Sequence, residues 1–154
     1  MRLRKIVFIT AVLLLFSSFC SAQIGGKIKT PTVSTQTISA AKSSPAYAEL
    51  LLRKTERESE LEEFALDYTD EFPKVQEIKF ELGSINKELN RVLAVSAADS
   101  AKLTLALGKL LVRKTEVETD LWNLRKQYNA DHPEVKRANR KVEIFEKAIK
   151  EILQ

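Results

Sequence analysis

The chain has 154 residues, of which 25 are basic and 21 acidic, and its only cysteine and methionine lie in the first twenty residues. It is 30% charged and 44% apolar, a composition typical of helical proteins and too hydrophobic for a disordered chain. Glycine and proline, four each, are too scarce for a loop-rich all-β fold. We therefore expect an all-α protein of one modest domain or two small ones.

Residues 1–22 have the pattern of a secretory signal peptide. Three basic side chains in residues 2–5 precede an apolar run over residues 6–16, and small residues precede a predicted cleavage after Ala22. A retained membrane anchor and a lipoprotein signal that uses Cys20 are the alternatives. The apolar run is short for a bilayer core of about 30 Å, which favours cleavage and a periplasmic or secreted protein.

Cleavage would change the charge of the chain. Without residues 1–22 there are 22 basic and 21 acidic side chains, so the net charge falls to +1. The basic excess is then a targeting feature, and we expect no nucleic-acid partner. We expect contact with a membrane only through the N-terminal segment, if it is retained. The rest of the chain has no cysteine, which excludes disulfides and zinc–thiolate sites there.

Residues 23–44 have the composition of a linker, with glycine, proline, many serines and threonines, three lysines and no acid. We expect a disordered linker that spaces the folded part from the export machinery. The alternative is a specific surface contact through Lys27, Lys29 and Lys42.

An internal repeat organises the rest of the chain. A shift of sixty residues aligns 49–93 with 109–153 without a gap, and thirteen of the forty-five pairs are identical. We expect one helical hairpin over 45–95 and a second over 96–154. The identical pairs include Arg53-Lys54-Thr55-Glu56 with Arg113-Lys114-Thr115-Glu116, Tyr68 with Tyr128, and Pro73 with Pro133.

Each copy has apolar residues spaced alternately by four and three, as in the seam of a coiled coil. Short breaks before Pro73 and Pro133 predict turns, so the flanking helices should fold back as antiparallel pairs. The architecture is then either a four-helix bundle or an elongated rod of two hairpins. The second copy's seam runs through Leu103, Leu107, Leu110, Lys114, Val117, Leu121, Leu124 and Tyr128, then Val135, Ala138, Val142, Phe145, Ile149 and Ile152.

The join between the copies carries neither glycine nor proline. Ser96 with Asp99 can form a capping box that starts the third helix near Ala97, and a continuous helix through both copies is the alternative. Residues 46–95 carry a net charge of −5, whereas residues 96–154 carry +3. Opposite signs favour contact between the hairpins, within one chain or between chains; solvated faces are the alternative.

The predicted hairpin tips hold the only histidine. We interpret His132 as a turn residue, because the aligned residue of the first copy is Phe72, which can neither titrate nor bind a metal. Trp122 and the tip tyrosines keep helical spacing with leucines, so we interpret them as packing residues. The tip residues are Tyr68, Phe72 and Pro73 in the first copy and Tyr128, His132 and Pro133 in the second.

Two lysines, Lys54 and Lys114, fall within the apolar seams. A polar residue in a seam can fix the register or the oligomeric state, and substrate binding is the alternative role. We expect Lys54 to pair across its hairpin with an acid such as Glu88. The residue that matches Glu88 is Ala148, so the partner of Lys114 should lie on the other hairpin.

The chain after residue 22 contains no nucleotide-binding glycine loop, metal-ligand cluster or nucleophile–base pair. We therefore expect no cofactor and no enzymatic activity.

The sequence Leu121-x-x-Leu124-x-x-x-Tyr128-x-x-x-His132-Pro133-Glu134-Val135, followed by an apolar seam, resembles the periplasmic helical hairpin of polysaccharide chain-length determinant proteins and their tyrosine-kinase relatives. Tyr68-x-x-x-Phe72-Pro73-Lys74-Val75 is a weaker copy of the same pattern. The resemblance implies an oligomeric scaffold outside the cytoplasm.

Together these features predict an exported coiled-coil protein of the bacterial cell envelope with a structural or protein-interaction role. Its expected partner is a second copy or another helical envelope protein. The alternatives are a holdase-like periplasmic chaperone and an accessory scaffold in envelope polysaccharide assembly. The seams are narrow and regular, which favours specific association over broad client binding.

Overall fold

The computed structural model describes residues 35–154, and this part of the chain is all helical, as predicted. The expected signal peptide, residues 1–22, and residues 23–34 of the expected linker lie outside the described residues. No described helix is long and apolar enough to cross a membrane. The elements are α1 (Thr35–Lys42), α2 (Pro45–Asp67), α3 (Pro73–Leu93), the 3₁₀ helix η1 (Ala97–Lys102), α4 (Leu105–Gln127) and α5 (Pro133–Leu153).

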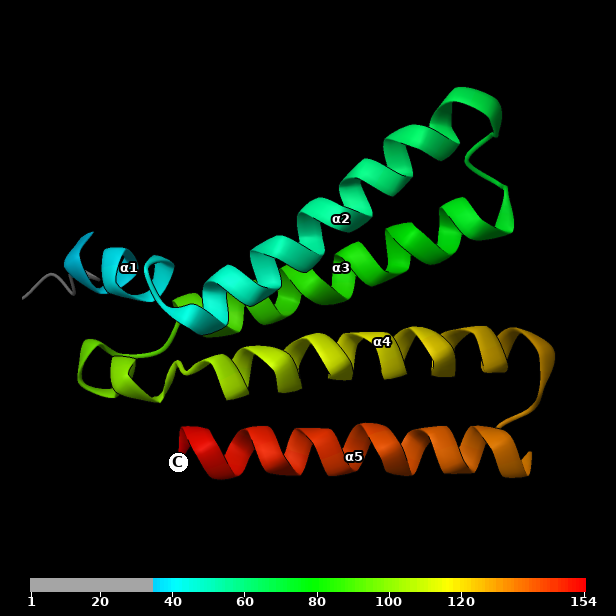
Figure 1. Cartoon of the computed structure of the whole chain (residues 1–154). Helices are drawn as coiled ribbons and strands as arrows, with labels where there is room; N and C mark the ends of the chain where they lie inside the picture. The colour runs from blue at the N-terminus through cyan, green and yellow to red at the C-terminus, as the bar shows by residue number, and fades with distance from the viewer. Residues whose placement is uncertain (1–34) are drawn as a thin grey trace, which may run out of the picture. The chain divides into compact units, whose positions relative to one another are not determined.

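The repeat appears in the structure as two pairs of helices, α2 with α3 and α4 with α5 (Figure 1). The chain reverses in the same way in both. Tyr68 and Tyr128, which end α2 and α4, both have φ −130° and ψ 151°. Pro73 and Pro133 then occupy the start of α3 and α5, where the missing N–H would have no helical partner anyway.

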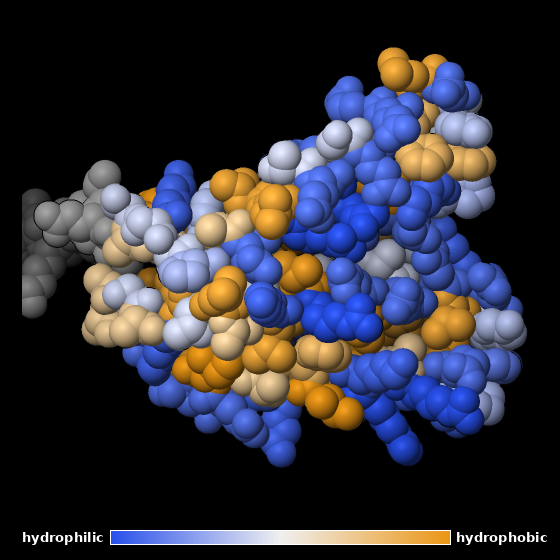
Figure 2. Space-filling model, viewed as in Figure 1, coloured by the Kyte–Doolittle hydropathy of each residue, from blue (hydrophilic) through white to orange (hydrophobic). Residues whose placement is uncertain are grey.

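The pairs lie side by side, because α4 contacts both helices of the first pair as well as α5 (Figure 1). At the end away from the tips, α1 and η1 pack on the pairs. The main apolar core lies at this end, and Figure 2 shows hydrophobic side chains gathered there while the arms are mostly hydrophilic. The buried core residues are Ala41, Ala46, Leu50, Ile85, Leu89, Val92, Leu103, Leu107, Leu111 and Ile149.

The prediction of a disordered linker up to residue 44 is wrong for its last part, which forms α1. Ala41 is only 2% exposed and belongs to the main core, so burial stabilises a helix that composition alone did not predict. Ser44 then caps α2, because its hydroxyl accepts a hydrogen bond from the Tyr47 N–H at 3.2 Å.

The third helix also begins later than predicted. Ser96 does cap a helix, accepting from the Asp99 N–H, but the helix is η1 and not the start of α4. The α-helix begins at Leu105, capped by Thr104. The alternative of one continuous helix through both copies is excluded, since η1 and its flanking residues separate α3 from α4 and let Leu103 enter the core.

Helix α4 lies very close to α2 at Gly108. A Cβ atom at this position would lie 2.9 Å from the Cα of Ala46 and 2.9 Å from the Cβ of Glu49. Such distances are shorter than van der Waals contact, so glycine is required for this separation of the two helices.

A matched pair of glycine substitutions tests this close approach. Gly83 also lies within a helix, but nothing is within 4 Å of a Cβ built there. Gly83→Ala should therefore stabilise the protein by about 0.5–1 kcal/mol through helix propensity alone. Gly108→Ala should give a free energy of unfolding lower than that of Gly83→Ala by about 1–3 kcal/mol, the cost of overpacking. Urea unfolding of both variants measures the difference, and equal stabilities would contradict the packing.

Candidate interaction site between the helical pairs

The buried ammonium group of Lys114 joins three helices. Its side chain is only 4% exposed, and its Nζ lies 2.6 Å from Glu88 Oε1 on α3 and 2.9 Å from Glu118 Oε1 on its own helix. Glu146 Oε2 on α5 lies 3.5 Å away. The principal partner is thus an acid of the other helical pair, as the sequence led us to expect.

The expected pair between Lys54 and Glu88 does not form. Lys54 is partly exposed on α2, and its Nζ lies 3.0 Å from Glu58 Oε1 of the same helix. Helix α2 turns Arg53 and Arg57 toward the other helices instead, and Glu88 is already held by Lys114. The two lysines match in sequence, yet only Lys114 lies between helices that cover it on several sides.

The charges around Lys114 favour its ionised form. Burial by itself would lower the pKa of Lys114, but hydrogen bonds and charges from Glu88 and Glu118 outweigh burial and hold the pKa above its ordinary value. Burial would raise the pKa of Glu146, but a hydrogen bond from Arg91 and the charges of Arg91 and Lys114 hold it below its ordinary value. The acids around Lys114 therefore favour its protonated ammonium form.

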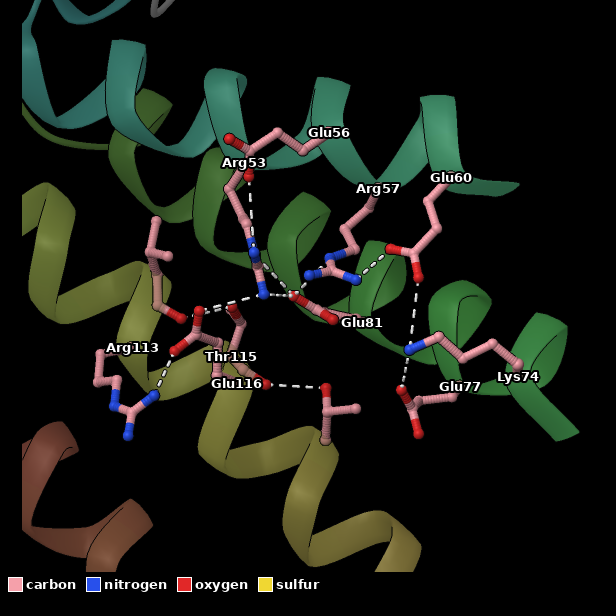
Figure 3. A network of polar contacts seen from close by, with 12 residues as sticks. Arg53, Glu56, Arg57, Glu60, Lys74, Glu77, Glu81, Arg113, Thr115 and Glu116 are labelled. Atoms are coloured by element: carbon pink, nitrogen blue, oxygen red, sulfur yellow. Dashed lines mark hydrogen bonds and ion pairs between the residues drawn. The ribbon is translucent and has the colours of Figure 1, made fainter. Parts of the chain in front are cut away.

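A second polar cluster joins α2, α3 and α4 (Figure 3). Arg53 donates to Glu81 Oε1 at 2.8 Å, and its Nη2 also lies 3.1 Å from Glu116 Oε1 on α4. Glu81 is buried, so it depends on Arg53 and on the neighbouring Arg57 for compensation of its charge. Arg53 is the residue that connects the two helical pairs here.

The cluster continues toward the tips. Lys74 lies 3.4 Å from Glu60 of α2 and 2.8 Å from Glu77 of its own helix (Figure 3). Glu77 also accepts a hydrogen bond from Asn123 of α4 at 2.7 Å. This second bridge fixes the angle between α3 and α4 beyond the apolar core.

An aromatic contact completes the junction of the pairs. Phe80 of α3 stacks on Trp122 of α4, with ring centroids 4.8 Å apart and planes inclined by 13°. Lys126 Nζ lies 3.2 Å from the centre of the Trp122 ring, a cation–π contact. A groove of about 480 Å³ opens beside this stack between α3, α4 and α5. Its other lining residues are Ser84, Lys87, Glu118, Leu121, Arg125, Asn139 and Val142.

The residues expected at the tips form two equivalent stacks. The rings of Tyr68 and Phe72 are 4.1 Å apart, and those of Tyr128 and His132 are 4.0 Å apart. His132 Nδ1 also accepts a hydrogen bond from the Glu134 N–H at 3.3 Å, so the side chain caps α5. At the first tip, Lys74 of the Arg53 cluster directly follows Pro73.

Sequence reasoning missed the face of α4 that packs on the first pair. Gly108, Thr115 and Thr119 are buried although none belongs to the predicted seam. Their spacing of seven and four residues places small side chains on one helical face. This sequence pattern indicates a face on which another helix can pack closely. The sequence indicated the bridging role of Arg53 less clearly, because arginine is common on exposed helix faces.

The described residues hold no group of three or more His, Cys, Asp or Glu side chains that could bind a metal ion. Comparison with protein-family models, with curated proteins and with solved structures finds no match for this chain.

The two lysines of the repeat provide a test of the buried cluster. Lys114→Met should lower the free energy of unfolding by about 3–5 kcal/mol, because it leaves Glu88 buried without its main cation. Lys54→Met is the matched control and should cost about 0–1 kcal/mol, since its ion pair is partly exposed. Urea unfolding followed by circular dichroism measures both, and equal losses would contradict the asymmetry.

The cluster also predicts loss of stability in acid. The pKa of Glu146 is lower in the folded chain than its ordinary value of 4.5, so its contribution is present above pH 4.5 and is lost as the pH falls through the folded value. Glu146→Gln should therefore make the free energy of unfolding less dependent on pH on the acid side. The exposed Glu151 serves as the control, and Glu151→Gln should leave the dependence unchanged. If Glu146→Gln left the pH dependence of the free energy of unfolding unchanged, the role assigned to Glu146 would be contradicted.

Proposed function

We propose that this protein is a non-enzymatic, exported helical scaffold that acts as a protein-interaction module in the bacterial cell envelope. In this proposal the α2–α3 and α4–α5 pairs are coiled-coil hairpins that present their surfaces to other helices. The observation that carries the proposal is the junction of the pairs, where ion pairs and a stacked aromatic contact leave a groove bounded by three helices.

The chemistry of the side chains supports a binding role over catalysis. The buried lysine, arginine and glutamate groups compensate one another across helices, and His132 is engaged by Tyr128 and by the backbone of α5. A general acid or base needs a partner that orients it and a pocket for substrate. Lys114 does line a cavity of about 420 Å³ with Lys87, Glu88, Arg91 and Glu146, but the acids beside it favour its ionised form, which has no lone pair to accept a proton.

The groove has the character of a surface that accepts a helix. Phe80, Leu121, Trp122 and Val142 supply apolar contacts, and charged residues such as Lys87 stand at its edge. Apolar centres with polar rims are typical of protein interfaces, and aromatic residues contribute strongly to binding. A helix laid between α3 and α5 would contact both and rest on α4.

Export is supported by the N-terminal sequence, with its basic residues, apolar run and small residues before position 23. The resemblance of the tips to the hairpin of polysaccharide chain-length determinant proteins supports the same compartment. An accessory role in envelope polysaccharide assembly is the narrower form of the proposal that this resemblance suggests.

Export and binding can be tested in one strain. The full coding sequence with a C-terminal tag should give a protein in the envelope fraction whose N-terminus, determined by mass spectrometry, is Gln23. A photoreactive residue in place of Lys87 should cross-link to a discrete protein partner. The same residue in place of Gln76, an exposed position of α3 outside the groove, should give no such product.

Other results would reject the proposal. An uncleaved protein confined to the cytoplasm would exclude the envelope role. Equal cross-linking from both positions to many proteins, together with suppression of client aggregation at stoichiometric amounts, would favour the holdase alternative.

A further inference from the structure

The internal repeat provides a template for contact between copies of the chain. In the structure α4 places one face on the α2–α3 pair, and Gly108, Thr115 and Thr119 of that face are buried. The matching positions of α2 are Ala48, Thr55 and Ser59, and all three are exposed. We call this exposed side of α2, residues 48, 52, 55, 56, 59, 62, 63 and 66, the outer face.

The surface that receives α4 has a counterpart as well. Residues of the α2–α3 pair that contact α4 match a set on the α4–α5 pair that is largely exposed. Arg113, Ile144 and Arg137 are 63%, 66% and 70% exposed. We call this set the receiving face, and it consists of Leu110, Arg113, Arg137, Arg140, Lys141 and Ile144.

The ion pair that links the helical pairs has equivalent residues sixty positions away in the other copy of the repeat. Within the chain, Arg53 lies 3.1 Å from Glu116. The equivalent contact between copies joins Arg113 to Glu56 of a second copy. Glu56 is 54% exposed, and its present ion pair with Arg53 is only a contact within α2, 3.5 Å long. Arg113 is likewise paired at present only within its own helix, with Glu116 at 2.6 Å, so both members are accessible and oppositely charged.

Two further contacts of the junction become ion pairs under the same shift. Phe80 and Trp122, which stack within the chain, correspond to Arg140 and Glu62. Glu77 and Asn123, which share a hydrogen bond, correspond to Arg137 and Glu63. All four counterparts are exposed. An aromatic stack and a hydrogen bond between an amide and a carboxylate are thus each replaced, at the matching positions, by a pair of opposite charges.

The shift does not preserve every contact. The pair formed by Lys114 and Glu88 corresponds to Lys54 and Ala148, which cannot form a salt bridge. Gly108 corresponds to Ala48, whose methyl group requires a somewhat wider separation of the helices than the contact at Ala46. The contact between copies is therefore more exposed and more dependent on charge than the junction within the chain.

We propose that copies of this chain associate head to tail, with the outer face of α2 in one copy seated on the receiving face of α4 and α5 in the next. The net charges favour this contact, because residues 46–95 carry a net charge of −5 and residues 96–154 a net charge of +3. The two faces differ, so the contact is heterologous and each added copy leaves one face of each kind open. The chain then extends its own repeat as solenoid proteins do.

This inference goes beyond the proposed function, because the outer face and the receiving face lie outside the groove beside Trp122. The test uses the protein as cells produce it from the full coding sequence. Light scattering should give a mass that rises with protein concentration and falls with added salt, which screens exposed charges. Association should weaken by at least about tenfold in E62K/E63K and in R137E/R140E, because four like charges would then meet in place of two attractive pairs.

A mixture of the two variants is the decisive measurement. Each variant keeps one natural face, and the reversed faces complement each other, so an equimolar mixture should regain association that neither variant has alone. Circular dichroism should show unchanged helix content, because all four positions are exposed. Two substitutions at the exposed Lys147 and Lys150, K147E/K150E, provide a charge-matched control outside the receiving face and should associate like the natural chain.

Three results would overturn the inference: a mass of one chain at every concentration, association that neither charge reversal weakens, or a mixture that behaves like its separate components. If the chain stays monomeric while position 87 still cross-links to a different envelope protein, head-to-tail association is excluded and the proposed interaction role stands.

Discussion

The placement of α4 depends on a charge that cannot be left uncompensated. Lys114 is buried where α3, α4 and α5 meet, and carboxylates from all three helices surround its ammonium group. A buried ion pair contributes little net stability, because desolvation offsets the attraction, but loss of one partner is costly. The cluster therefore acts mainly on specificity, since a rotation of α4 that separated Lys114 from Glu88 would leave Glu88 buried without its main cation.

The two copies of the repeat have diverged according to their surroundings. The tips keep the same backbone angles and the same aromatic stack, with His132 in the place of Phe72, because each tip closes its own turn. The long faces differ, because α4 is covered by both helices of the first pair and by α5, whereas α2 has an open side. Leu111 is accordingly 1% exposed and the matching Leu51 43% exposed.

The junction within the chain and the two proposed binding faces use different kinds of contact. The aromatic contact between the pairs has a charged, exposed counterpart on the outer and receiving faces, and the buried small residues of α4 have exposed small counterparts on α2. Covered faces can use shape and apolar area, whereas a surface that must remain soluble before it binds uses charge for recognition. The groove beside Trp122 lies elsewhere, between α3 and α5, and is available to a different helix.

The sequence by itself determined the helical class, the sixty-residue repeat, the two turns and most of the apolar seam, because these follow from local periodicity and from proline at the helix starts. It also indicated that Lys114 needs an acid from the other hairpin. Only the tertiary structure decided that Lys54 and Glu88 do not pair, that residues 35–42 form a helix, and that Gly108, Thr115 and Thr119 are buried. Each of these outcomes depends on which helix faces meet across long sequence separations, and a periodic pattern specifies a face without specifying its neighbour.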